Sequence, residues 1–243
     1  MIEIRNLHKT FSGDPVLRGI DMDVLDGETL VILGPSGQGK TVLIKSLVRL
    51  IEPDLGSIRY DGTEILGLSK REFREVQKTI SFVFQENALF DFLNIQENLG
   101  LYLRMHTQLT EEEIYAEVKR SLEFVRLDEE VLVKFPEELS GGMKKRVAIA
   151  RAMIQNPCYM FYDEPTTGLD EANVEMVIDL IDLFKKKVCA TAVIVTHDIH
   201  LMREVSDRVI LLKEGKIFFV GNKEDISAKT LHTLYDTGEK YDR

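Results

Sequence analysis

A glycine-rich stretch near the N-terminus has the residue types and spacing of a phosphate-binding loop. It fits the pattern G-x-x-x-x-G-K-[ST] without a gap and consists of Gly34, Pro35, Ser36, Gly37, Gln38, Gly39, Lys40 and Thr41. An apolar run at 30–33 precedes it and a helical pattern at 42–50 follows it, which is the setting that such a loop requires. Its glycines let backbone N–H groups approach an anion at the positive end of the helix, and Lys40 adds a positive charge. Thr41 offers a hydroxyl ligand to a magnesium ion held by the nucleotide. An ordinary glycine-rich turn would not reproduce the whole pattern, so we predict that the chain binds a nucleoside triphosphate.

Polar side chains also follow three other apolar, strand-like runs. They are Gln85 after 79–84, Asp163 and Glu164 after 158–162, and His197 after 192–195. Parallel sheets bind ligands at the carboxyl ends of their strands. At that edge, Asp163 can hold magnesium directly or through a water, and Gln85 can reach a metal or a water. Glu164 can polarise an attacking water, and His197 can donate to a γ-phosphate. Taken singly, they have ordinary alternatives: a solvated loop glutamine, a structural histidine and two acids that cap a turn. The phosphate-binding loop favours the catalytic interpretation.

A second helix start has the features of an anion site. Ser140 is a good N-cap residue, and Gly141 and Gly142 let the backbone approach a phosphate where a helical pattern over 147–154 begins. Upstream of the phosphate-binding loop, Phe11 can stack on a purine and Val16 can cover the edge of the base. Such stacking contributes about 1 kcal/mol or more and tolerates different bases, although a single phenylalanine is more often a core residue.

Composition limits the class of protein. The chain has 243 residues, of which 44% are hydrophobic and 30% charged, as in globular proteins. Its 31 Lys and Arg against 41 Asp and Glu give a net charge of −10, which argues against a nucleic-acid partner or an anionic membrane surface. Cys158 and Cys189 lack paired metal-ligand spacing, so we expect buried, reduced thiols. No apolar run approaches the ~18 residues of a membrane span, so another chain would have to supply any spans.

The patterns between the motifs predict an α/β fold. Strands are expected at 2–7, 20–24 and 57–60, a helix capped by Ser69 at 70–76, a helix at 171–184, a terminal hairpin from 208–212 and 216–220, and a helix at 225–235. The segment 86–138 is expected to be an inserted helical subdomain in which Thr110 opens a helix with a capping box. Its entry, 87–93, is apolar for a loop, which indicates either a docking surface or aromatic residues packed beneath the helices. The tail, 237–243, is expected to be mobile.

Taken in order, these motifs resemble those of ATP-binding cassette (ABC) ATPases over nearly the whole chain. The resemblance rests on the loop at 34–41, Gln85, Leu-Ser-Gly-Gly-Met at 139–143, Asp163-Glu164, Gly-Leu-Asp at 168–170 and His197. It implies a P-loop NTPase of the ABC type in one domain over 1–243, with a mostly parallel core sheet flanked by helices, an N-terminal antiparallel β subdomain and the helical insertion at 86–138.

The same resemblance implies a role for each site residue. Phe11 would stack on adenine and the loop at 34–41 would wrap the phosphates of ATP. Thr41, Gln85 and Asp163 would serve Mg²⁺, Glu164 would be the general base, and His197 would contact the γ-phosphate. Two chains would pack head to tail, so that the Ser140 helix start of one closes over the nucleotide of the other, which requires a homodimer.

A finer likeness rests on fewer residues. Met143 in place of the usual glutamine, followed by Lys-Lys-Arg, and the sequence Ala-Leu-Phe-Asp at 88–91 are similar to the ATPase of Mla-type (MCE-associated) phospholipid transporters. This likeness implies membrane permease subunits docking near 88–93, an MCE-type lipid-binding subunit, and a peripheral location on the cytoplasmic face of the inner membrane. Val42 departs from the second Thr or Ser of many cassettes but leaves Thr41 in place.

Four other functions are weighed against transport of a phospholipid. Importers of amino acids or other polar solutes share the general cassette. Cassettes of chromosome maintenance carry a long coiled-coil insertion, for which the segment between Gln85 and Ser140 is too short, and translation-factor types carry two cassettes in one chain. A nucleotide switch without turnover is disfavoured by Glu164.

Overall fold

The structure is a computed structural model and describes residues 1–188 and 190–235. The chain divides into two compact units. The first contains Met1–Gln77 and the segment that begins at Thr191, and the second contains Lys78–Ala190. Cys189 and the tail predicted to be mobile, 237–243, lie outside the described residues.

The first unit contains a four-stranded sheet near the N-terminus. Its strands are β1 (Ile2–Phe11), β2 (Asp14–Val24), β4 (Leu55–Tyr60) and β5 (Thr63–Glu64), in the order β2-β1-β4-β5. Each neighbouring pair is antiparallel, and the paired part of β1 runs past the predicted end at residue 7 to reach Phe11. Ile2, Ile4 and Leu7 on β1 are buried, because alternate side chains of a strand face the core.

The first unit also contains the strands that carry the phosphate-binding loop. Strand β3 (Thr29–Leu33) pairs in parallel with β8 (Thr191–Thr196) on one side and with β9 (Arg208–Lys213) on the other. Strand β10 (Lys216–Gly221) is antiparallel to β9 and completes the predicted terminal hairpin. Every residue of β3 and β8 is buried, as in parallel sheets that are covered on both faces.

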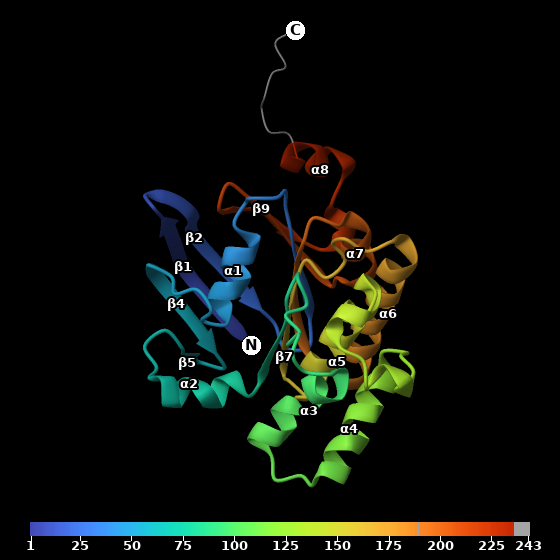
Figure 1. Ribbon diagram of the computed structural model, residues 1–243. Helices are drawn as coiled ribbons and strands as arrows, with labels where there is room; N and C mark the ends of the chain where they lie inside the picture. The colour runs from blue at the N-terminus through green and yellow to red at the C-terminus, as the bar shows by residue number, and fades with distance from the viewer. Residues whose placement is uncertain (189, 236–243) are drawn as a thin grey trace. The chain divides into compact units, whose positions relative to one another are not determined.

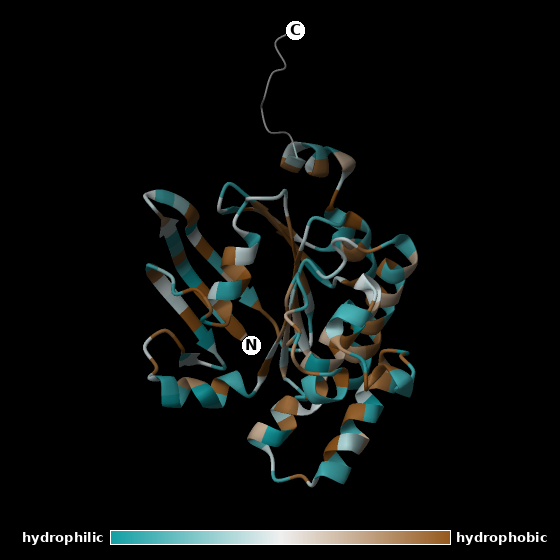
Figure 2. Cartoon of the chain, viewed as in Figure 1, coloured by the Kyte–Doolittle hydropathy of each residue, from teal (hydrophilic) through white to brown (hydrophobic). Residues whose placement is uncertain are grey.

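Helices of the first unit are α1 (Lys40–Leu47), α2 (Lys70–Gln77), α7 (Ile199–Val205) and α8 (Ala228–Tyr235) (Figure 1). The predicted cap of α2 is confirmed, because Ser69 Oγ accepts a hydrogen bond from the Glu72 amide. Helix α2 has no buried residue among those described and is mostly hydrophilic in Figure 2. The helix predicted over 225–235 begins later, at Ala228, after a short 3-10 turn at Lys223–Asp225.

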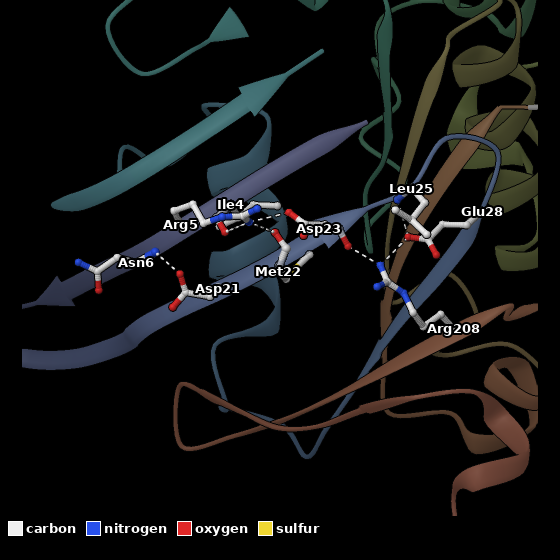
Figure 3. A network of polar contacts seen from close by, with 9 residues as sticks. All are labelled: Ile4, Arg5, Asn6, Asp21, Met22, Asp23, Leu25, Glu28 and Arg208. Carbon is white, nitrogen blue, oxygen red and sulfur yellow. Dashed lines mark hydrogen bonds and ion pairs between the residues drawn. The ribbon is translucent and has the colours of Figure 1, made fainter. Parts of the chain in front are cut away.

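A polar network fastens the antiparallel sheet to the parallel strands within the first unit (Figure 3). Arg208 at the start of β9 donates to the carbonyl of Asp23 on β2 and, at 2.7 Å, to the carboxylate of Glu28. The same carboxylate accepts the Leu25 amide at 2.6 Å. Because these contacts lie where β2 leads into β3, they fix the hairpin that carries Phe11 relative to the strand that ends at the phosphate-binding loop.

The second unit contains the remaining parallel strands, β6 (Ile80–Val83) and β7 (Tyr159–Asp163), which pair with each other. Its helices are α3 (Ile95–His106), α4 (Glu111–Phe124), α5 (Gly141–Met153) and α6 (Glu171–Val188), with 3-10 turns at Glu129–Val131 and Pro136–Glu138. Helices α3 and α4 fall within the predicted insertion, 86–138, and Figure 2 shows both hydrophobic and hydrophilic residues along them.

The predicted cap of α4 is confirmed. Thr110 Oγ1 accepts the Glu113 amide at 3.3 Å, and the Glu113 carboxylate accepts the Thr110 amide at 2.7 Å. The predicted apolar face is buried as well, and consists of Ile114, Val118, Leu122 and Val125. Helix α5 begins at Gly141 rather than at 147, because the Ser140 cap starts the helix directly after itself.

One expectation about the cysteines is wrong. Cys158 is exposed rather than buried, because it precedes β7 and only its backbone takes part in the sheet, where its amide donates to the Thr79 carbonyl at 2.9 Å. Among the described residues, no helix combines the length and the hydropathy that a membrane span requires.

Candidate functional site

The phosphate-binding loop joins the end of β3 to the start of α1. The Gly34 amide donates to the Thr196 carbonyl at 3.3 Å, and Lys40 Nζ donates to the carbonyls of Gly34 at 2.7 Å and Pro35 at 3.0 Å. Gly37 and Gly39 have φ angles of 79° and 94°, in the left-handed region that favours glycine. The loop is therefore held in a ring by its own lysine and by the neighbouring strand β8.

The start of α1 fits a phosphate group. Its N-cap residue is Gly39, and among the described residues no side chain caps it and no acidic residue lies in its first turn. A helix N-terminus of this kind presents amide N–H groups and a partial positive charge to an anion. A β-carbon on Gly37 would meet no atom within 4 Å, which leaves room on the outer side of the loop.

The predicted base-binding residues lie on the hairpin of β1 and β2. Val16 lies beside the phosphate-binding loop, since a β-carbon on Gly39 would come within 2.9 Å of the Val16 carbonyl oxygen and 3.2 Å of its Cγ1. Phe11 is the last residue of β1 and is 43% exposed, so it is not the core residue that its type alone favours. Lys9 Nζ lies 5.3 Å from the centroid of the Phe11 ring. The ring is thus presented to solvent on the hairpin that reaches the loop.

His197 lies close to the same loop. It directly follows β8, whose last residue, Thr196, is the partner of Leu33 and accepts the Gly34 amide. The side chain of His197 is exposed, and its backbone carbonyl accepts the Tyr235 hydroxyl at 3.1 Å. Tyr235, which ends α8, gives no local signal of this contact in the sequence.

The two neighbouring carboxylates end β7 in the second unit. Asp163 is 1% exposed and Glu164 is 7% exposed. Glu164 has a φ angle of 48°, a left-handed conformation that costs a residue other than glycine about 1–3 kcal/mol. Thr167 Oγ1 donates to the Glu164 carboxylate at 3.3 Å. The chain thus turns sharply at the residue that we predict to be the base.

Gln85 lies two residues after β6, with its side chain exposed, in a turn that α5 holds. Lys145 Nζ donates to the carbonyls of Phe84 at 3.2 Å and Gln85 at 2.8 Å. Arg151, farther along α5, donates to the carbonyls of Asn87 at 3.0 Å and Ala88 at 2.7 Å. The sequence gives no signal of the contact that either cation makes: Lys145 enters the sequence analysis only within the Lys-Lys-Arg run after Met143, and Arg151 lies in an ordinary helical pattern.

The predicted second anion site forms the first turn of α5. Ser140 Oγ accepts the Met143 amide at 3.3 Å, as expected of an N-cap. Gly141 is exposed, and a β-carbon there would meet no atom within 4 Å. Gly142 is buried against Asn173 of α6, whose Oδ1 would lie 2.1 Å from a β-carbon on Gly142. The side-chain Nδ2 of Asn173 donates to both carboxylate oxygens of Asp170 at 2.9 Å.

The apolar loop before α3 is exposed at its aromatic residues. Phe90 is 42% exposed and Phe92 is 77% exposed, and their ring centroids are 5.8 Å apart. They therefore do not pack beneath the helices of their own unit. The buried Asn98 holds the loop, since its Oδ1 accepts the Phe90 amide at 2.8 Å and its Nδ2 donates to the Phe90 carbonyl at 3.0 Å.

The structure thus gathers the predicted residues in two sets, one in each unit. The first unit holds Phe11, Val16, the loop at 34–41 and His197, and the second holds Gln85, Ser140, Gly141, Gly142, Asp163 and Glu164. Within the described residues, no group of three His, Cys, Asp or Glu side chains could hold a metal. By their chemistry, Thr41 in the first unit and Gln85 and Asp163 in the second each supply an oxygen donor of the kind that Mg²⁺ takes together with phosphate oxygens.

Comparison with known proteins gives matches over most of the chain. Residues 17–167 match the family model described as ABC transporter. The probable ribonucleotide transport ATP-binding protein mkl of Mycobacterium leprae is 38% identical over 92% of this chain and 64% of its own length. The L-cystine import ATP-binding protein TcyN of Bacillus subtilis is 38% identical over 95% of this chain and 89% of its own. The methionine import ATP-binding protein MetN of Bordetella avium is 35% identical over 96% of this chain and 65% of its own. The chain therefore spans less than two thirds of the length of the mkl and MetN relatives.

Solved structures resemble the fold over most of the chain. The dimeric, post-hydrolysis structure of the ATP-binding cassette MJ0796, bound to ADP and Pi, has a TM-score of 0.86 and 31% identity, and covers 92% of this chain and 99% of that one. The structure of cbiO1 from Clostridium perfringens has a TM-score of 0.83 and 30% identity, and covers 97% of this chain and 94% of that one. These likenesses confirm the predicted fold class, an α/β cassette with an antiparallel N-terminal sheet and a parallel sheet with helices.

Proposed function

The chain belongs to the ABC transporter family, and we propose from this premise that it is the ATP-hydrolysing subunit of a membrane transporter. ATP and Mg²⁺ are its cofactors. The observation that supports turnover most strongly is Glu164, a carboxylate that is only 7% exposed and lies in a sharp turn directly after the buried strand end at Asp163. A carboxylate in that place can accept a proton from the attacking water, which a nucleotide switch without turnover would not need.

Each part of the site has a proposed role. Phe11 stacks on the base and Val16 covers its edge, the loop at 34–41 binds the phosphates, and His197 contacts the γ-phosphate. Thr41, Gln85 and Asp163 serve Mg²⁺, and Glu164 is the general base. When bound, Mg²⁺ would supply positive charge to the phosphates, and the residues of the chain would position the reacting groups.

We propose that two copies of the chain act as a head-to-tail homodimer. The start of α5 in one subunit then closes over the nucleotide bound by the phosphate-binding loop of the other. The open space around Gly141 and the Ser140 cap support this role, since a ligand can approach the backbone there. The dimeric form of the similar cassette MJ0796 supports it as well.

For the transported substrate we propose a phospholipid, moved by a transporter of the Mla or MCE type. Met143 and the Ala88 to Asp91 sequence support this choice. Integral permease subunits dock near 88–93, where the rings of Phe90 and Phe92 are exposed and their loop is held by Asn98. An MCE-type lipid-binding subunit completes the complex, and the ATPase lies peripherally on the cytoplasmic face of the inner membrane.

An importer of amino acids or another polar solute is the second candidate. It is supported by the names of the relatives, which describe import of L-cystine and methionine and transport of ribonucleotides. The two candidates predict different ligands in the intact complex.

One experiment separates them. The chain is purified with its native membrane partners, small molecules bound to the complex are identified by mass spectrometry, and ATP hydrolysis is measured with added phospholipid or amino acids. Bound phospholipid and stimulation by phospholipid are expected. A bound amino acid, with stimulation by that amino acid alone, would instead establish the second candidate.

A further inference from the structure

Helix α5 carries a buried cation that the proposed site does not use. Lys145 is 1% exposed, although lysine is almost never fully buried without partners. Its ammonium group donates to the Phe84 and Gln85 carbonyls, and the Phe84 carbonyl also accepts the Asn87 amide at 3.1 Å. Lys145 therefore holds the backbone of the turn that contains Gln85 by two hydrogen bonds.

Two features of the second unit act on the charge of Lys145: its burial and the nearby carboxylate of Asp163. Burial lowers the pKa of Lys145 to about 8, whereas the nearby Asp163 carboxylate acts to raise it. A methionine would fill a similar volume without the cost of dehydrating an ammonium group. The use of a lysine therefore points to its hydrogen bonds with the two carbonyls and to its attraction to Asp163, rather than to filling the core.

Arg151 makes similar hydrogen bonds to the backbone farther along this turn. It donates to the Asn87 and Ala88 carbonyls, and its guanidinium carbon lies 5.9 Å from the centroid of the Phe90 ring. Asn87 and Ala88 have φ angles of 63° and 49°, so the turn takes a conformation that side chains other than glycine rarely adopt. Two cations from one helix thus hold a turn whose backbone is intrinsically unfavourable.

We propose that Lys145 is a positioning residue for ATP hydrolysis. Its hydrogen bonds fix the backbone of Gln85 to the helix that begins at Ser140. This inference rests on the proposed function, because it takes Gln85 to serve Mg²⁺. Lys145 lies five residues after Ser140 on one rigid helix, so a displacement of the helix start carries the Gln85 carbonyl with it. Closure of α5 on the partner's nucleotide is thereby transmitted to the Mg²⁺ ligand of its own subunit.

The test compares Lys145→Met, Lys145→Gln and Lys145→Arg with Lys144→Met, in which the adjacent lysine of the same helix is changed. All are made in the full-length chain, and folding is checked by thermal melting. Hydrogen exchange of the amides at 85–90 is measured without nucleotide. The kcat and KM for ATP hydrolysis, and the Mg²⁺ concentration that gives half-maximal rate, are then measured, together with binding of a fluorescent ATP analogue in EDTA.

We expect Lys145→Met to speed exchange at 85–90, to lower kcat at least ~10-fold and to raise the Mg²⁺ requirement, because small displacements of a positioned group have large effects on rate. Binding of the analogue in EDTA should be unchanged, since it depends on the phosphate-binding loop. Lys145→Arg should recover most of the rate because it keeps a charged donor, Lys145→Gln should be intermediate, and Lys144→Met should behave as the wild type. If Lys145→Met does not fold, the exchange, the kcat and the Mg²⁺ requirement of Lys145→Gln and Lys145→Arg are compared instead.

A folded Lys145→Met or Lys145→Gln protein with wild-type kcat and Mg²⁺ requirement would overturn the inference. So would unchanged exchange at 85–90, or a lower melting temperature that accounts for the whole loss of rate. Failure of the proposed function is a separate result: a wild-type chain that hydrolyses no ATP would refute the function, while the exchange data would still decide whether Lys145 orders the turn.

Discussion

The two adjacent glycines at the start of α5 predict opposite effects on stability when each is changed to alanine. At Gly141 an added methyl group meets no atom within 4 Å, and the helix gains the ~0.5–1 kcal/mol by which alanine exceeds glycine. At Gly142 the same methyl group would lie 2.1 Å from Oδ1 and 2.4 Å from Cγ of Asn173. The whole carboxamide must then move, and overpacking of this kind costs about 1–3 kcal/mol.

The expected net changes follow by subtraction. After the gain in helix propensity, Gly142→Ala should lower the free energy of unfolding by about 0–2.5 kcal/mol, whereas Gly141→Ala should raise it by up to ~1 kcal/mol. Urea unfolding of the two variants measures both values in the full-length chain. Adding Asn173→Ala to Gly142→Ala removes the carboxamide, so the double variant should regain stability.

ATP hydrolysis provides the second assay. In the proposed dimer both glycines lie where the partner's nucleotide is covered, so both alanine variants should hydrolyse ATP more slowly even though only one is destabilised. The double variant Gly142→Ala/Asn173→Ala should regain stability but still hydrolyse ATP slowly. This result would show that the loss of rate comes from the contact with nucleotide and not from the clash with Asn173. Equal stabilities of Gly141→Ala and Gly142→Ala would refute the packing argument, and wild-type turnover in both would remove this helix start from the site.

Three further predictions concern the other parts of the site. Glu164→Gln should bind ATP but hydrolyse it at least about 100-fold more slowly, because an amide cannot accept the proton of water; near-normal turnover of the purified variant would exclude Glu164 as the base. Lys40→Ala and Ser140→Arg should each abolish turnover, whereas a mixture should recover about a quarter to a half of the activity through one intact composite site; light scattering with ATP that finds only monomers would contradict the shared site. Phe90→Glu should leave the chain folded, since Phe90 is 42% exposed, but should prevent assembly with the membrane subunits; full co-purification would place the docking surface elsewhere.

The local parts of the fold and site follow from the sequence. Spacing alone predicts the phosphate-binding loop, because a strand end, glycines and a helix start are consecutive in the chain. Thr110 and Ser140 are predicted as caps for the same reason, since a capping side chain reaches an amide three residues away. Apolar periodicity likewise predicts the buried face of α4.

Tertiary structure decides the exposure of individual side chains. The apolar run around Cys158 predicts a buried thiol, yet Cys158 lies just before β7 and is exposed. A one-residue difference in where a strand begins moves a side chain out of the core. Phe11 and Phe90 are apolar by type, but burial depends on which other elements cover them, and this is settled by segments far away in the chain.

The contacts that hold the site also depend on the tertiary structure. Lys145 reaches the carbonyl of Gln85, 60 residues away, and Tyr235 reaches the carbonyl of His197, 38 residues away. Every residue has a backbone carbonyl, so an acceptor of this kind leaves no mark in the sequence. The sequence by itself determined which side chains can perform the chemistry, whereas the tertiary structure decided which parts of the backbone hold them in place.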